Sequence, residues 1–297
     1  MRPDRRALVT GASGFIGAHL CRRLRRDGTD VYAVSRTTTS SELEDLNWMH
    51  ADLGSVDAVR EVLAAAKPSV IFHLASRVSG SRDLDAVLPT FHDNLTTTVN
   101  LLTVATEVGC ERIVLAGSLE EQDPGAVPGS PYAAAKFAAS IYARMFDALY
   151  GTPVVVARLF MVYGPGQRDL RKLVPYSTLS LLRREAPQVT SGERPVDWIY
   201  IDDVIDGLLA AAETDGLAGQ TVDVGSGELV TVRSVVEHLN RLTGSPVTLE
   251  FGRLPDRAME RVRAADVERT VAQMGWRPTV SLEEGLRRTV QWYADRQ

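Results

Sequence analysis

The stretch RALVTGASGFIGAHLCRRL, residues 6–24, decides the fold of this 297-residue chain. A short apolar run is followed by a turn that carries Gly11, Gly14 and Gly17, and by a helical pattern that begins at about Ser13. A strand, a glycine-rich turn and a helix in this order bring backbone N–H groups and a helix N-terminus to one point, which suits a pyrophosphate. The stretch therefore predicts a dinucleotide-binding start rather than an ordinary strand-to-helix turn.

Beyond this start, strand-like runs alternate with helical stretches through the first half of the chain. The runs are DVYAVSR, MHADL, SVIFHLAS, RIVLAGS and PVVVARLFMVYG. This alternation is typical of an α/β protein with a doubly wound parallel sheet. Past Gly164 the pattern becomes irregular, so we expect residues 1–164 to form a dinucleotide-binding domain, to which strands near 196–226 return. Residues 165–195 and 227–297 are expected to form a smaller C-terminal substrate-binding lobe.

Composition indicates a globular protein and excludes several classes of function. Hydrophobic residues make up 44% of the sequence, and the net charge of -5 does not favour binding to nucleic acid. No segment has the apolar length needed to cross a membrane, and the first strand comes too early for a signal peptide, so we expect a cytoplasmic protein. Cys21 and Cys110 lack metal-ligand spacing and are interpreted as small core residues, so no metal site is expected.

Tyr132 and Lys136 stand four residues apart in SPYAAAK, residues 130–136. Ser130 can cap a helix and Pro131 fits its first turn, so both functional side chains are expected on one helical face. A neighbouring ammonium favours the phenolate of a tyrosine, and we therefore expect Tyr132 to exchange protons near neutral pH. The pair alone also fits an exposed tyrosine and lysine on an alanine-rich helix, but the dinucleotide-binding start favours chemistry.

Seven motifs follow one another along nearly the whole chain: TGASGFIG, ADL, HLAS, YAAAK, VYGPGQ, WIYIDDV and MGWRPTVSLEEGL. In this combination they resemble the extended short-chain dehydrogenase/reductases of the NAD-dependent epimerase/dehydratase family, which act on nucleotide sugars. The resemblance implies a Rossmann-type fold and a catalytic group of Ser118, Tyr132 and Lys136. Ser118 would orient a substrate carbonyl, Tyr132 would donate a proton to its oxygen, and Lys136 would hold the nicotinamide ribose.

The end of the second strand indicates which cofactor is used. It carries Ser35 and Arg36, and a cation at this point favours the additional phosphate of NADP, whereas an acidic residue favours NAD. The hydroxyl-rich residues 37–41 could complete a phosphate pocket, so NADP(H) is preferred and NAD(H) is possible; a solvated arginine is the alternative. Asp52 fits either an adenine contact or a helix cap. The cofactor contacts further include Gly11, Ser13, Gly14, Phe15, Ile16, Gly17, Leu53, Leu74, Ala75 and Ser76, beside Tyr132 and Lys136.

The segment GSLEEQD, residues 117–123, departs from the pattern of related dehydratases. Leu119 stands where they usually carry a polar or acidic group, and it cannot transfer a proton, which weakens a 4,6-dehydratase assignment. Glu120 could act as a base or hold a sugar hydroxyl, whereas Glu121 is equally compatible with a solvated loop. Together with Arg36, Leu119 favours reduction of a keto sugar.

Two arginines are candidate anion ligands for the substrate: Arg194, in GERPVDW, and Arg257, in LPDRAME. Surface salt bridging is the alternative for both. Met161 and Val196 stand where relatives commonly carry asparagine and arginine, and Met161 is interpreted as packing. Asn94 could hydrogen-bond backbone to shape the site, or be a structural asparagine.

The sequence thus predicts an NADPH-dependent reductase of a nucleotide-linked 4-keto-6-deoxy sugar. The alternatives are a nucleotide-sugar epimerase or 4,6-dehydratase with bound NAD and, from another class, a nonenzymatic NADP-sensing regulator. Two long helical stretches, LDAVLPTFHDNLTTTVNLLTVATEVG and SPYAAAKFAASIYARMFDALYG, are candidates for a homodimer interface.

Overall fold

The computed structural model describes residues 5–36, 43, 45–123, 125–256 and 258–296. It contains a seven-stranded parallel sheet and a separate three-stranded sheet, which confirms the predicted α/β fold with a smaller C-terminal sheet. In spatial order, the strands of the large sheet are β3 (Asn47–His50), β2 (Asp30–Ser35), β1 (Arg6–Thr10), β4 (Val70–His73), β5 (Arg112–Ser118), β6 (Val154–Leu159) and β9 (Thr221–Val224).

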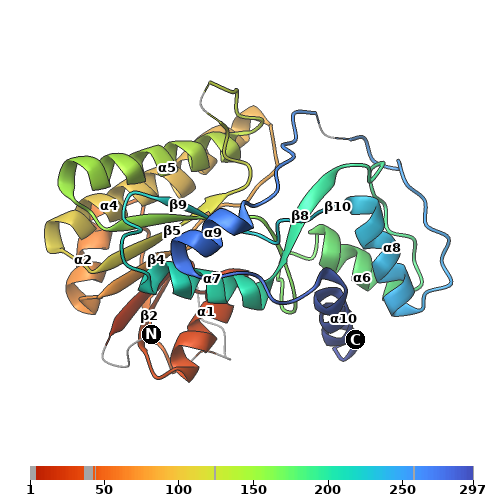
Figure 1. The fold of residues 1–297 in the computed structure, drawn as a ribbon, viewed down its shortest axis with the longest axis horizontal. Coiled ribbons are helices and arrows are strands. Elements are labelled where there is room, and N and C mark those ends of the chain that lie inside the picture. Colours follow the sequence, from red (N-terminus) through yellow and green to blue (C-terminus); the bar gives the residue numbers. More distant parts are fainter. Residues whose placement is uncertain (1–4, 37–42, 44, 124, 257, 297) are drawn as a thin grey trace.

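Helices cover both faces of the large sheet (Figure 1). The central strands are therefore buried on both sides, and β5 is buried along its whole length, as its continuous apolar run predicts. One face carries α2 (Val56–Ala66), α4 (Thr97–Val108) and α5 (Pro131–Tyr150), and the other carries α1 (Phe15–Arg26) and α7 (Ile201–Glu213).

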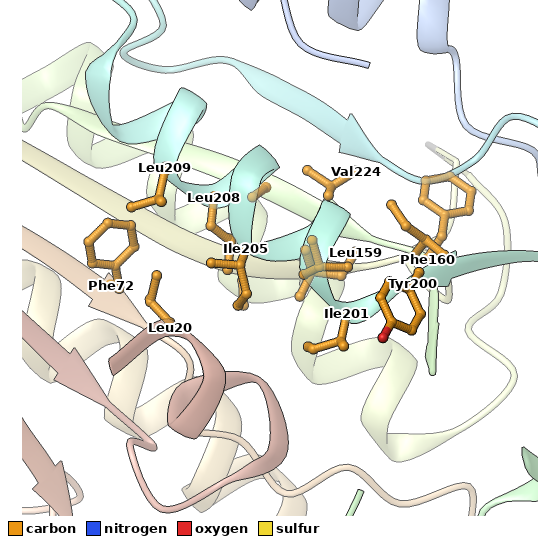
Figure 2. Close-up of a cluster of buried hydrophobic side chains, with 14 of the residues drawn as sticks. Leu20, Phe72, Leu159, Phe160, Tyr200, Ile201, Ile205, Leu208, Leu209 and Val224 are labelled. Carbon is orange, nitrogen blue, oxygen red and sulfur yellow. The ribbon is translucent and has the colours of Figure 1, made fainter. Parts of the chain in front are cut away.

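The apolar side of α7 closes the core on its face of the sheet. Figure 2 shows Ile205 and Leu208 pointing toward Leu20 of α1 and Phe72 of β4. These four side chains are at most 3% exposed. Burying a large aliphatic or aromatic side chain contributes about 1.5–3 kcal/mol, so this seam fixes α1 firmly on the sheet.

The run PVVVARLFMVYG crosses from one sheet to the other. It forms β6 and then, after Phe160, β7 (Met161–Tyr163) of the small sheet. Of the later strands expected to return to the large sheet, β9 does so, whereas β8 (Pro195–Tyr200) pairs with β7 and β10 (Leu229–Thr231). Three later helices, α6 (Leu173–Leu182), α8 (Val232–Thr243) and α10 (Leu282–Ala294), pack together beside the small sheet, and α9 (Val267–Met274) lies against β9.

The helix expected over residues 84–109 is interrupted. It consists of the short η2 (Leu84–Ala86) and α3 (Val87–Phe91), the π-helical segment η3 (His92–Thr96) and then α4. Pro89 is tolerated in the first turn of α3, where backbone N–H groups have no helical partner. Wider π turns are frequent at functional sites, and this one carries Asn94. No helix among the described residues is long and apolar enough to span a membrane.

Candidate active site

A cavity of about 550 Å³ lies at the carboxyl ends of the central strands, where ligands of parallel sheets bind. Gly11 lines it from the end of β1 and Ser118 from the end of β5, while Tyr132 and Lys136 reach it from the first turns of α5. The structure therefore brings the glycine-rich turn and the three predicted catalytic side chains to one space.

The glycine-rich turn leaves no room for side chains at two of its positions. Gly11 has φ 67°, and a Cβ there would lie 2.7 Å from the backbone nitrogen of Ala75. A Cβ on Gly17 would lie 2.2 Å from the carbonyl oxygen of Gly11. Gly14 is the N-cap of α1, which begins at Phe15, two residues later than expected. This open cradle before a helix N-terminus fits the pyrophosphate of a dinucleotide.

The other predicted cofactor residues divide into two groups. Phe15, Ile16, Leu74 and Ser76 line the cavity, as the glycines do. Ser13, Ser35, Arg36, Asp52, Leu53 and Ala75 are described residues outside that lining.

Asp52 forms a local turn and is not the helix cap that its structural alternative expected. Its Oδ1 accepts from the backbone N–H of Gly54 at 3.0 Å, just before α2. The helix cap itself is Ser55, whose hydroxyl accepts from Ala58. The predicted adenine contact of Asp52 stays a prediction.

Asn94 shapes the wall of the cavity. Its Oδ1 accepts from Ser76 Oγ and from the backbone nitrogen of Arg77, both at 2.8 Å, and its Nδ2 donates to Arg77 O at 3.1 Å. Asn94 is only 1% exposed, so these bonds satisfy a buried amide. Its role is therefore structural: it holds the loop that follows β4.

Arg36 is paired with a carboxylate of the protein itself. Its Nη1 donates to Asp93 Oδ1 at 3.0 Å, and Arg77 Nε donates to the other oxygen of Asp93 at 2.8 Å. The negative charge of Asp93 opposes a second anion next to Arg36. Residues 37–41, the predicted hydroxyl-rich half of a phosphate pocket, lie outside the described residues.

The start of α5 follows the prediction. Ser130 is its N-cap, with its hydroxyl 3.1 Å from the backbone nitrogen of Ala133, and Pro131 is its first residue. Such a cap stabilises a helix by about 1 kcal/mol. The cap fixes the phase of the helix, and Tyr132 and Lys136 both face the cavity.

The predicted lowering of the Tyr132 pKa is wrong. Burial raises the pKa of Tyr132 to about 12, and the carboxylates of Glu121 and Glu120 act in the same direction. Hydrogen bonding with Ser118 and Ser76 only partly opposes this shift. The neighbouring cation is visible in the sequence, but the loss of solvation, which disfavours the phenolate, is not. At neutral pH, Tyr132 is therefore a protonated phenol and a proton donor.

The pKa that is shifted toward neutral pH is that of Lys136 rather than that of Tyr132. Lys136 is 4% exposed, and its Nζ donates to the carbonyl oxygen of Ala116 at 2.8 Å. Burial lowers the pKa of Lys136 to about 8, although the carboxylate of Glu121 opposes this. The ammonium is thus charged at neutral pH but close to losing its proton.

Arg194 lies in the cavity wall within a cluster of charges. Its Nη2 donates to Glu120 Oε1 at 3.3 Å and to the carbonyl oxygen of Arg261 at 2.8 Å, and its Nη1 lies 3.1 Å from Glu260 Oε1. Both the anion-ligand and the salt-bridge interpretations thus retain support. Arg257, the other predicted ligand, lies outside the described residues.

Five further residues at or beside the cavity are not predicted as site residues from the sequence. Arg82, Arg168, Lys172 and Glu260 line the cavity from loops whose approach depends on the fold. Glu121, treated as equally compatible with a solvated loop, is 2% exposed. The only signal in the sequence is the charged run QRDLRK, residues 167–172, which contains Arg168 and Lys172 but does not indicate where they lie in the fold.

Several other residues lie in the hydrophobic core or pack against it. Met161 lines the cavity and packs against the core, and Val196 is 3% exposed. Cys21 and Cys110 are free thiols, and burial raises the pKa of Cys21 to about 12. Within the part of the chain that the structure describes, no group of three His, Cys, Asp or Glu side chains could hold a metal ion.

Comparison with known proteins agrees with this architecture. The model of the NAD dependent epimerase/dehydratase family matches residues 7–225. The chain belongs to this family. It is therefore an NAD-dependent enzyme of the extended short-chain dehydrogenase/reductase type. The motifs predicted this type of enzyme, whereas the sequence favoured NADP(H) as its cofactor.

Two curated relatives match this chain over nearly its whole length. The UDP-glucose 4-epimerase of Mycolicibacterium smegmatis is 31% identical over 98% of this chain and 99% of its own length. The UDP-glucuronate 4-epimerase of Thermodesulfobacterium geofontis is 28% identical over 96% and 95%. Among solved structures, MoeE5 in complex with UDP-glucuronic acid and NAD is 30% identical, with 98% and 99% of the chains covered and a TM-score of 0.85. The two curated relatives favour the epimerase alternative over the predicted reductase.

Proposed function

We propose that this protein is an NAD-dependent 4-epimerase of a nucleotide-linked hexose, which oxidises C4 to a ketone and reduces it again from the opposite face. The supporting observation is the single cavity that joins the glycine cradle to Ser118, Tyr132 and Lys136. The full-length likeness to two 4-epimerases supports the choice of reaction within the family.

The proposed reaction gives Tyr132, Lys136 and Ser118 different roles in proton transfer. When bound, NAD would supply the hydride acceptor and return the same hydride. Tyr132 would exchange a proton with the C4 oxygen through its hydroxyl group, and Lys136 would hold the cofactor ribose and add a positive charge nearby. Ser118 Oγ accepts from the backbone N–H of Glu120 at 3.2 Å, which leaves its own hydrogen for the same substrate oxygen.

The proposed cofactor is NAD rather than the NADP preferred from the sequence. Arg36 is the residue that suggested NADP, but Asp93 already pairs with its guanidinium at 3.0 Å. A 2′-phosphate placed at Arg36 would meet that carboxylate as well. Because the Arg36 side chain is 57% exposed, the effect of this ion pair on cofactor choice is modest.

A second candidate is the reductase of a 4-keto-6-deoxy sugar, which one observation favours. A tyrosine whose pKa is raised to about 12 is ready to donate a proton, as reduction requires, before it can accept one. Leu119 is 6% exposed and has no acidic group, which still weakens a 4,6-dehydratase.

Cations around the cavity suggest where the substrate diphosphate binds. Arg168, Lys172 and Arg194 line it from the segment between β7 and β8, and Arg82 lines it from the loop after β4. Arginine and lysine are the usual partners of phosphate oxygens. We place the nucleotide half of the substrate there, which accords with a substrate lobe that begins at residue 165.

A second copy of the chain is the proposed protein partner. Leu88 and Phe91 of α3 and Leu149 and Tyr150 of α5 are 76%, 52%, 67% and 58% exposed, and the two helices are in contact. Exposed apolar side chains in such number commonly mark an interface. Light scattering on the eluting protein would give the mass of a dimer, and Leu149→Glu should shift it toward the monomer.

The test of the proposed function is a product analysis, carried out first with no cofactor added and then with added NADPH and a nucleotide-linked 4-keto-6-deoxy sugar. Purified protein would be incubated with UDP- and dTDP-linked hexoses, and the sugar C4 configuration followed by proton NMR. An epimer that accumulates without net NADH formation supports the proposal. Stoichiometric oxidation of added NADPH by a nucleotide-linked 4-keto-6-deoxy sugar would instead establish the reductase. Ligand binding without turnover would indicate the sensor.

A further inference from the structure

Glu121 is a buried carboxylate that contacts the backbone of Ser118, a member of the proposed catalytic group. Its Oε1 accepts from the backbone N–H of Ser118 at 2.7 Å, and its own backbone N–H donates to Ser118 O at 3.0 Å. Two hydrogen bonds therefore close a tight turn between these residues. Because Ser118 ends β5, this turn sets the direction in which the Ser118 hydroxyl leaves the strand.

The fold reserves space for this carboxylate. A Cβ on Gly117 would lie 2.5 Å from Glu121 Oε1 and 2.8 Å from Val156 Cγ1. A side chain at Gly117 would therefore displace the carboxylate or strand β6. A glycine at the residue before Ser118 thus allows Glu121 to approach the backbone of β5.

Glu121 lies among charges from several elements. Arg158 Nε of β6 lies 3.9 Å from its Oε2, and Arg158 is in turn held by Asp223 of β9 at 3.0 Å. Arg263 Nη1 donates to the carbonyl oxygen of Glu121 at 3.3 Å. Burial raises the pKa of Glu121, while the Ser118 N–H and the Arg158 charge oppose the rise.

Lys136 has few other groups that stabilise its charge. His73 of β4 faces it but is uncharged, because burial and the Lys136 ammonium lower the pKa of His73 to about 3. Tyr132 on its own helix is protonated at neutral pH, and Glu120 acts on Tyr132. The Glu121 carboxylate and the Lys136 ammonium bind the backbone of β5 two residues apart, since Glu121 Oε1 accepts from the Ser118 N–H and Lys136 Nζ donates to Ala116 O. Glu121 is therefore the nearby carboxylate whose charge favours the Lys136 ammonium.

We propose that Glu121 is a positioning residue: one of its oxygens fixes the Ser118 backbone, and its negative charge keeps the buried Lys136 ammonium protonated. The inference rests on the proposed function only for its kinetic readout. Glu121→Gln keeps an oxygen that can accept from Ser118 but removes the charge. Glu121→Asp keeps the charge but withdraws it from Ser118 by one methylene, so the two variants separate the two roles.

The chain contains only three lysines, Lys67, Lys136 and Lys172, so the ammonium can be titrated directly. Protein labelled with ¹³C-lysine would give three Cε resonances, assigned with Lys67→Arg and Lys172→Arg. Removing an opposite charge disfavours an ammonium, so Glu121→Gln should lower the midpoint of Lys136 by about one pH unit. At pH 8, its charged fraction would fall from about one half to about one tenth.

Asp123→Asn is the matched control, because it removes one negative charge from the same segment. Asp123 is exposed and pairs with Arg261 and Arg263 rather than with Lys136. The titration midpoint of Lys136 in Asp123→Asn should equal that of the wild type. An unchanged midpoint in Glu121→Gln, or an equal fall in both variants, would overturn the charge role. This readout uses no substrate, so it stands even if the proposed epimerase activity fails.

Kinetics supply the second readout on the active enzyme. In Glu121→Gln, the alkaline fall of kcat should begin about one pH unit lower, because Lys136 loses its proton earlier. In Glu121→Asp, that fall should stay in place while kcat drops about tenfold from a displaced Ser118. Wild-type kcat in Glu121→Asp would refute the seating role. Melting temperatures show whether each variant is folded. If Glu121→Gln is not folded, Glu121→Ala takes its place because it also removes the charge, and an unchanged Lys136 midpoint in that variant would refute the charge role.

Discussion

The two ends of the cavity are built in different ways. The cofactor end is made of backbone: Gly11 and Gly17 leave space that any side chain would fill, and their contacts lie within the turn or at the neighbouring β4 loop. The substrate end is made of charges, where Arg194 pairs with Glu120, 74 residues earlier, and with Glu260 near the far end of the chain.

This difference separates rigidity from adaptability. Backbone packing at the cofactor end has one arrangement, which suits a dinucleotide that is the same in every turnover. Ion pairs at the substrate end can exchange partners with a ligand, since a carboxylate and a diphosphate compete for the same guanidinium. Tyr132 stands where the two ends meet, and variants at each end should therefore fail in different measurements.

The largest effect is expected at the junction. Tyr132→Phe removes the group that exchanges the proton while keeping the ring, so kcat should fall by about 10³-fold or more. Cofactor and substrate affinity, measured by calorimetry, should change little. A regulator that only senses its ligand would keep its full response in this variant, and retention of turnover would remove Tyr132 from the chemistry.

The second largest effect is expected at the cofactor end, where one added methyl group should weaken NAD binding. In Gly11→Ala, the new Cβ would meet the Ala75 nitrogen at 2.7 Å, and we expect NAD affinity to fall about 100-fold as the turn is displaced. Gly28→Ala is the matched control, because Gly28 also has positive φ but no atom within 4 Å of its Cβ. Gly28→Ala should cost only about 1–2 kcal/mol of stability and leave NAD affinity intact. Equal NAD affinity in the two variants would contradict the cradle.

The sequence predicts the cofactor end because its information is local. A turn, its strand and its helix occupy 21 residues, Arg6–Arg26, and the cap of α5 lies within one heptapeptide. The substrate end depends on contacts between distant segments. Glu121 could not be placed because its burial requires Gly117 and Arg158, and the pKa direction of Tyr132 failed because proximity of Lys136 is visible in sequence while desolvation is not.

The substrate end should respond more gently. Arg194→Gln removes the cation and leaves Glu120 and Glu260 facing the substrate, so KM for the nucleotide sugar should rise about tenfold. NAD affinity should stay constant, because the cradle is untouched. Arg183→Gln is the control, since it breaks an exposed pair with Glu185 that contributes under about 1 kcal/mol. A KM equal to that of the control would assign Arg194 to the salt bridge alone.

The smallest effect tests cofactor choice at Arg36. Its side chain is 57% exposed and already paired, so Arg36→Ser should change NAD affinity by less than about twofold. Asp93→Asn removes the carboxylate charge next to Arg36 while keeping the shape of the side chain. NADP affinity should therefore rise a few-fold, while NAD affinity stays constant. Fluorescence titration with both dinucleotides measures each constant. If Arg36→Ser instead weakened NADP binding strongly in the presence of an intact Asp93, the ion pair would not prevent phosphate recognition, and the reductase with NADPH would regain its cofactor.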